Sequence, residues 1–163
     1  MTSFDEIFDR ALHRIEKDGD FFSYFNVSQQ ETEEIIRQRL LSYLIDSVDK
    51  VYENGNPQID MYDYDLELQQ FNIDLTKREI GLLSSLMFLV HLERSEAVLD
   101  AFKHRMSPSD LTVFSPKAER DSFMNMLRDV RHECSINLSR YFSTDRLTNE
   151  HLTIQHDQYD YES

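Results

Sequence analysis

The sequence predicts an all-α protein: a single helical bundle of about four main helices, with an extended segment near residues 56–73 and a flexible C-terminal arm. Three observations lead to this prediction. The 163 residues include only 3 glycines and 3 prolines, whereas β-sandwiches and barrels need many turns. Capping motifs precede runs of apolar residues at helical spacing. An apolar content of 40% is enough for one domain with a real core.

The first two helices are each predicted from a capping box. In this motif a Ser hydroxyl accepts a hydrogen bond from the backbone N–H three residues later, and the Glu side chain at that position accepts one from the Ser N–H. The first box is at residues 3–6, and its helix ends before the Asp-Gly-Asp sequence at residues 18–20. The second box is at residues 28–31, and the turn sequence NGNP at residues 54–57 ends that helix.

Four aromatic residues lie between these two helices: Phe21, Phe22, Tyr24 and Phe25. We expect them to cover the open end of the helical core, because they follow one helix stop and precede one helix start. The alternative is an exposed patch that binds a partner.

The third helix is predicted from a capping box at residues 76–79 and extends to about Arg105. Its first half is apolar on nearly every side, which is typical of a central helix with neighbours all round. The fourth helix is predicted to begin after Ser115 as cap, with Pro116 at the first helical position, and to continue to about residue 142.

The segment at residues 56–73 alternates apolar and acidic residues around Tyr64, which predicts a short strand or an extended cover across the bundle. Residues 149–163 have four acids, no Lys or Arg and no helical periodicity. We therefore expect a bundle domain at residues 1–148 and a flexible arm at residues 149–163. The HLTIQ sequence in this arm could pair as a strand with a partner's exposed sheet edge.

The net charge of −14 repels nucleic-acid backbones and anionic lipid, and it suits solubility or a basic protein partner. The longest apolar stretch, residues 80–92, is shorter than the ~20 residues that a membrane span needs. With Cys134 as the single cysteine, no internal disulfide can form. We expect no sequence-specific nucleic-acid binding and no membrane association.

No constellation of residues predicts a cofactor, a metal or a catalytic group. The acids of the DMYDYDLEL sequence, residues 60–68, lack the central Gly and the spacing of a calcium loop. His132 and Cys134 lie roughly 200° apart on a helix, so they cannot bind one ion together. Cys134 is expected to be a small core residue; the alternative is a nucleophile with His132 or His91 as its base. His91 is expected to be a core or boundary histidine and not a ligand.

Arginines concentrate in and just beyond the fourth helix. We expect most of them to pair with acids on neighbouring helices. The alternative is a basic strip that receives an acidic arm from another subunit, and its members would be Arg120, Arg128, Arg131 and Arg140.

Several phrases of the sequence together resemble a group of small helical proteins from tailed bacteriophages and prophages. The phrases are FFSYFNVSQQETEEIIRQRLLSYL, FNIDLTKREIGLLSSLMF, VFSPKAERDSFMNML and YFSTDRLTNE, and they cover roughly residues 20–150. The resemblance implies a virion protein of the head–tail connector, or neck. It implies a homo-oligomeric ring whose partners are the portal protein and other neck or tail proteins. It transfers no catalytic residue.

The leading hypothesis is therefore a structural adaptor that docks between portal and tail components and is not an enzyme. The candidate anchors of its arm are Leu152, Ile154, Tyr159 and Tyr161. One alternative is an acidic inhibitor that mimics DNA and occupies a DNA-binding enzyme, although the acids are interspersed with Arg and Lys. Another is a different phage tail completion or assembly protein.

Overall fold

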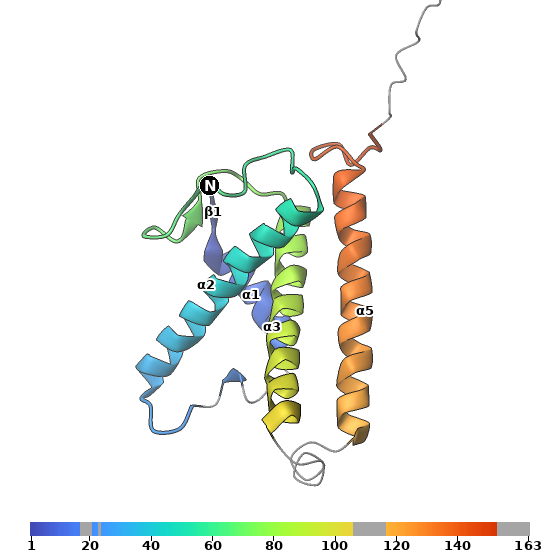
Figure 1. Ribbon diagram of the computed structural model, residues 1–163. Helices are drawn as coiled ribbons and strands as arrows, with labels where there is room; N and C mark the ends of the chain where they lie inside the picture. Colours follow the sequence, from blue (N-terminus) through green and yellow to red (C-terminus); the bar gives the residue numbers. More distant parts are fainter. Residues whose placement is uncertain (17–20, 23, 106–116, 153–163) are drawn as a thin grey trace, which may run out of the picture.

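The computed structural model describes residues 1–16, 21–22, 24–105 and 117–152, with the side chains of residues 102–105 left out. Within these ranges the chain forms a helical bundle with a small sheet at one end (Figure 1). Its elements are β1 (Thr2–Ser3), α1 (Phe4–Ile15), α2 (Gln29–Asn54), β2 (Tyr64–Asp65), β3 (Gln70–Phe71), α3 (Lys77–Arg105) and α5 (Lys117–Phe142). The predicted all-α bundle of about four helices is confirmed.

Helix α3 is the centre of the bundle. It contacts α1, α2 and α5, and Figure 1 shows α2 crossing it obliquely while α5 runs alongside it. Its side chains Leu83, Leu86 and Met87 are fully buried. The apolar run that surrounds the first half of α3 therefore has a neighbour on each side, as the sequence predicts.

Two of the three predicted capping boxes form in full. At the start of α2, the Ser28 hydroxyl accepts from the Glu31 backbone N–H at 3.3 Å, and the Glu31 carboxylate accepts from the Ser28 N–H at 2.9 Å. Thr76 and Glu79 make the same reciprocal pair before α3. Ser3 caps α1 by accepting from the Asp5 N–H, and no return bond from a glutamate is found among the described residues. The predicted cap at Ser115 lies outside the described residues.

The small sheet explains the alternating segment only in part. β3 pairs antiparallel with β1 on one side and with β2 on the other, and the Phe71 side chain is fully buried against Phe4. The predicted short strand extends only over Tyr64–Asp65, and Leu66 and Leu68, which continue the alternation, are 50% and 67% exposed. The chain turns there, because the Asp65 carboxylate accepts from the backbone N–H groups of residues 67 and 68.

After α5 the chain folds into a short turn, residues 143–152, which we call the C-terminal turn. The Asp145 carboxylate accepts from the backbone N–H groups of Leu147 and Thr148, which holds the pKa of this carboxyl below its usual value. An isolated antiparallel bridge joins Thr144 to His151. The domain boundary predicted at residue 148 thus falls inside a hydrogen-bonded turn.

Candidate partner-binding site

Of the four predicted arm anchors, only Leu152 lies within the described residues; Ile154, Tyr159 and Tyr161 lie outside them. Leu152 is 52% exposed, and its backbone N–H donates to the Ser143 carbonyl at 2.9 Å. The chain is therefore held against the end of α5 as far as residue 152, and any arm would begin from this fixed point.

A buried carboxylate fixes the C-terminal turn to the bundle. Glu79, at the start of α3, is completely buried, and its Oε1 accepts from Arg146 Nε at 2.8 Å and from the Tyr141 hydroxyl at 3.2 Å. Its Oε2 accepts from the Thr76 N–H of the capping box at 2.7 Å. Burial and the Glu79 charge both raise the pKa of Tyr141, so its hydroxyl stays protonated and donates.

Further hydrogen bonds hold the same turn. Arg78 Nη1 donates to the Thr144 hydroxyl at 2.6 Å and to the Asn149 side-chain oxygen at 3.0 Å. The Gln58 side chain donates to the Thr144 carbonyl and accepts from the Arg146 backbone N–H, each at 3.0 Å. We call the contacts of Glu79, Arg146, Tyr141, Arg78 and Gln58 the C-terminal latch.

Among the arginines of the predicted basic strip, Arg131 is paired within its own chain. Its guanidinium donates to Glu93 at 3.2 Å and to Glu96 at 2.7 Å, both on α3. Arg131 therefore joins α5 to α3, which is the role that the sequence favours for these arginines.

The other three arginines of the strip lie in different settings on α5. Arg128 donates to the Asn125 side chain one turn earlier at 3.0 Å. Arg120 has a contact of its own and is half-buried. Arg140 is exposed and borders a small hollow of about 310 Å³ between α3 and α5. Arg128 and Arg131 therefore contact different partners, on α5 and on α3.

A second hollow lies between α1, α2, α3 and α5, about midway along α3. Its volume is about 780 Å³, within the ~300–1,000 Å³ range of ligand pockets. Most of its wall is apolar, and three guanidinium groups border it. Its lining includes Arg14, Arg39, Tyr43, Phe88, His91 and Arg94. We call it the arginine-lined cavity.

Arg39, on α2, is held at this cavity by aromatic residues and not by an acid. Its guanidinium donates to the hydroxyls of Tyr24 at 2.6 Å and Tyr43 at 3.1 Å, and it lies 4.5 Å from the centre of the Phe21 ring. No carboxylate partner of Arg39 is found among the described residues. Burial opposes its charge, but the tyrosine hydrogen bonds raise its pKa, so it remains cationic.

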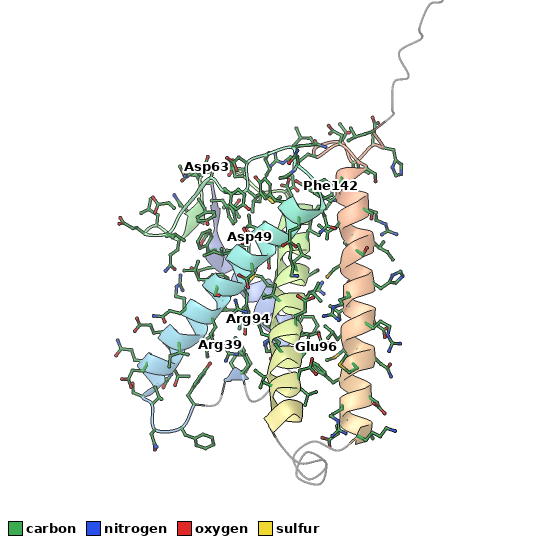
Figure 2. All side chains as sticks on the ribbon, in the orientation of Figure 1. Arg39, Asp49, Asp63, Arg94, Glu96 and Phe142 are labelled. Atoms are coloured by element: carbon green, nitrogen blue, oxygen red, sulfur yellow. The ribbon has the colours of Figure 1, made fainter. Side chains whose placement is uncertain are left out.

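Arg94 and Arg14 complete the cationic rim. Arg94, on α3, donates to Asp46 at 2.6 Å and to Ser42 at 2.7 Å, and it lies 4.7 Å over the Tyr43 ring. Figure 2 shows Arg39 and Arg94 between α2 and α3. Arg14, on α1, has only a long contact of 4.0 Å to Glu133 among the described residues.

Tyr43 and His91 form the polar part of the cavity wall. Both side chains are almost fully buried, and the Tyr43 hydroxyl lies 3.4 Å from His91 Nδ1. His91 also contacts the rings of Phe21 and Phe88. The prediction that His91 is a core residue is confirmed.

The four aromatic residues before α2 divide between the two alternatives. Phe21 is buried in the core at the cavity, as the covering role predicts, whereas Phe25 is 92% exposed and Phe22 is 38% exposed. Tyr24 is half-buried and meets Arg39. Phe21 therefore closes the core, while Phe22 and Phe25 present apolar surface to solvent.

No sequence motif assigns Arg14, Arg39 or Arg94 to a site. A signal for two of them does exist. Arg39 lies one turn before Tyr43 on the apolar stripe of α2, and Arg94 lies just after the apolar run of α3. Cations within or beside apolar stripes are placed next to the core, but spacing alone does not show that two helices bring them to the same hollow.

The acids of the alternating segment act as local hydrogen-bond acceptors. Asp60 accepts from the Tyr62 backbone N–H and Asp63 from the Asn72 side chain, each within 2.9 Å, while Asp65 makes the turn described above. No group of three or more His, Cys, Asp or Glu side chains that could hold a metal ion is found in the described ranges.

Cys134 is 2% exposed on α5, and its thiol contacts the Ser85 carbonyl at 3.6 Å. Burial raises the pKa of this thiol to about 11, which disfavours the nucleophilic thiolate. The prediction that Cys134 is a core residue is confirmed. No helix in the part of the chain that the structure describes is long and apolar enough to cross a membrane.

Comparison of the chain with protein-family models, with curated proteins and with solved structures finds no match. The features that bear on function are therefore the cavity, the C-terminal turn and the sequence beyond it.

Proposed function

We propose that this protein is a structural adaptor that joins other proteins through its surfaces and its C-terminal segment, and that it acts in the head–tail connector of a tailed bacteriophage. The observation that carries the proposal is the C-terminal latch. A buried ion pair and a set of hydrogen bonds fix the chain up to Leu152 on a rigid bundle. The segment that follows carries the tyrosines and acids of the predicted arm.

A fixed starting point favours binding through a short segment. A segment that leaves a rigid body at one defined place reaches only a limited volume, so several copies in a ring act at high effective concentration. Exposed apolar side chains at the same end, Leu147 at 74% and Leu152 at 52%, add contact surface beside the start of the segment.

The arrangement of the acids favours an adaptor over a DNA mimic. A mimic needs carboxylates that are free to stand in for phosphates along one face. On the α2–α3 face, Asp46 pairs with Arg94, and Glu93 pairs with Lys50 at 2.9 Å and with Arg131. These acids stabilise contacts between helices.

The proposal is tested in the phage or prophage that encodes the chain. Deletion of the gene is expected to leave separate heads and tails in electron micrographs, and the full chain supplied in trans restores joined particles. A chain ended at Leu152 is expected to fail, although its circular dichroism and urea unfolding match those of the full chain. This end point keeps Asn149 and the rest of the latch.

Ser139→Ala is the matched control for expression, because Ser139 is exposed on α5 and alanine suits a helix interior. It is expected to restore joined particles. Joined, infective particles in the absence of the gene would refute the adaptor role, and full activity of the chain ended at Leu152 would refute the role of the arm.

A further inference from the structure

Cations border the arginine-lined cavity although the chain as a whole is strongly acidic. The chain has a net charge of −14, yet three arginines and no Asp or Glu line this cavity among the described residues. Asp46, the acid nearest in contact, is bound to Arg94. Such a pocket favours a ligand that combines carboxylates with aromatic or apolar groups.

Arg39 is the side chain best placed to bind a new carboxylate. A guanidinium has five N–H donors in a planar fork. Arg39 donates hydrogen bonds to two tyrosine hydroxyls, so other donors are available for a ligand. It is half-buried, and a charge-assisted hydrogen bond is stronger in such a setting than in bulk water. The Phe21 ring beneath it and the Phe88 ring in the wall supply surfaces for an aromatic side chain.

The sequence beyond the C-terminal turn has the matching chemistry. Residues 153–163 contain Asp157, Tyr159, Asp160, Tyr161 and Glu162 and no Lys or Arg. A tyrosine between two acids can insert its ring between apolar walls while the flanking carboxylates meet guanidinium groups. We propose that the arginine-lined cavity binds the Tyr159–Glu162 segment of a second copy of this chain.

Chain length favours a second copy over the same chain. Met126, at the cavity, and Phe142, at the other end of α5, are 16 residues apart, which is ~24 Å along a helix. The seven residues from Leu152 to Tyr159 span at most ~23–25 Å when fully extended. The two lengths are nearly equal, so Tyr159 would reach the Met126 wall of its own cavity only if the segment were almost fully extended along α5. A neighbouring copy has no such constraint.

This inference names the contact by which the proposed adaptor would join copies of itself, and to that extent it rests on the proposed function. The arginines of the cavity are not members of the predicted basic strip. In that strip, Arg131 is already paired with Glu93 and Glu96. The contact itself is tested on the purified full chain, without phage particles.

The first experiment locates the segment. A photo-crosslinking amino acid replaces Tyr161 in the full chain, and equal amounts of unlabelled and ¹⁵N-labelled protein are mixed and irradiated. The expected result is crosslinked peptides of mixed isotope composition that join residue 161 to the cavity wall, at residues 14–15, 39, 88–98 or 123–126. Crosslinks confined to single chains, crosslinks to other surfaces or an absence of mixed pairs would overturn the inference.

The second experiment measures the charge contribution. An amidated, fluorescein-labelled peptide of residues 149–163 is titrated with the full chain and followed by fluorescence anisotropy. Arg39→Gln is expected to weaken binding about tenfold, the scale of one charge-assisted hydrogen bond. Arg128→Gln removes the same charge from α5 outside the cavity and is expected to leave the affinity within about twofold.

A change in the peptide avoids any effect on folding. Replacing Asp160 and Glu162 by Asn and Gln in the peptide is expected to weaken binding to the unaltered chain by about tenfold or more. Equal affinity of the two peptides would overturn the inference. If joined particles require residues 153–163 but no mixed crosslinks form, the adaptor role stands and this contact is wrong. If mixed crosslinks form but the chain is dispensable for joining heads to tails, the contact stands and the adaptor role is wrong.

Discussion

The ion pair between Glu79 and Arg146 is the residue-scale feature on which the C-terminal turn depends. Glu79 is fully buried and the Arg146 side chain is 18% exposed, so the pair is shielded from water. The pair joins the first turn of α3 to a segment 67 residues later. Loss of one partner leaves a buried charge without compensation, which costs more than the intact pair contributes.

We therefore expect Arg146→Ala to lower the free energy of unfolding by about 3 kcal/mol. Urea unfolding followed by circular dichroism measures the change. Arg128→Ala, the exposed control on α5, is expected to change the free energy by no more than about 0.5 kcal/mol. Equal effects of the two substitutions would show that the Glu79–Arg146 pair does not fix the turn.

The buried thiol of Cys134 gives a second test at this scale. Because burial raises its pKa to about 11, the native thiol is expected to react with a disulfide reagent far more slowly than the unfolded chain at pH 8. The raised pKa stabilises the fold fully below the unfolded value of 9.0, and this contribution is lost as the pH rises toward about 11. Comparing reaction rates with and without urea measures the protection; equal rates would contradict the burial.

At the scale of elements, the helices could be predicted because their signals are local. The boxes at residues 28–31 and 76–79 need only neighbouring residues, and α2 and α3 begin where these boxes place them. The exposure of Leu66 and Leu68 could not be read from alternation, since one aspartate carboxylate redirects the chain before the pattern ends.

The candidate site was less accessible to sequence reasoning, because it depends on long-range contacts. The C-terminal latch joins residues 58, 78 and 79 to residues 141–149, and nothing in the YFSTDRLTNE phrase specifies those partners. Similarly, Arg39 and Arg94 meet at one tyrosine only because α2 crosses α3 at that level. The chemistry of the predicted arm was visible in sequence, but the position of a cationic hollow was not.

The capping box of α2 provides an element-scale prediction. Ser28→Ala removes the acceptor for the Glu31 N–H and is expected to lower the free energy of unfolding by about 1 kcal/mol. Ser139→Ala is the matched control, because Ser139 is exposed inside α5 and alanine suits a helix interior, so its effect is expected within about 0.5 kcal/mol. Both are measured by urea unfolding, and equal values would show that the cap contributes nothing.

The same substitution has a pH signature. Hydrogen bonds from the Ser28 side chain and backbone hold the pKa of Glu31 below its usual value, so the box stabilises α2 above the unfolded pKa and this stabilisation is lost as the pH falls through the folded pKa. The difference between the wild-type chain and Ser28→Ala is therefore expected to shrink in acid. If the difference in the free energy of unfolding did not change with pH, the Ser28 hydroxyl and not the Glu31 charge would account for it.

For the whole molecule, the proposed contact has a defined symmetry. The segment leaves at one end of the bundle, whereas the cavity lies about midway along α3, so two copies would meet through different surfaces. Such a head-to-tail contact makes a closed ring when the rotation between copies closes, and an open filament when it does not. A closed ring is the outcome that would suit the proposed connector role.

The net charge of −14 also acts on the molecule as a whole and opposes compaction by self-repulsion. Raising the ionic strength from about 0.01 M to about 0.15 M shortens the Debye length from ~30 Å to ~8 Å, which screens this long-range repulsion. The exposed ion pairs, such as Arg37 with Asp5 and Arg94 with Asp46, are short-range and each contributes only ~0–1 kcal/mol. We therefore expect added NaCl in this range to raise the free energy of urea unfolding. A decrease would show that the paired acids dominate the electrostatics and that the net charge has little influence on the fold.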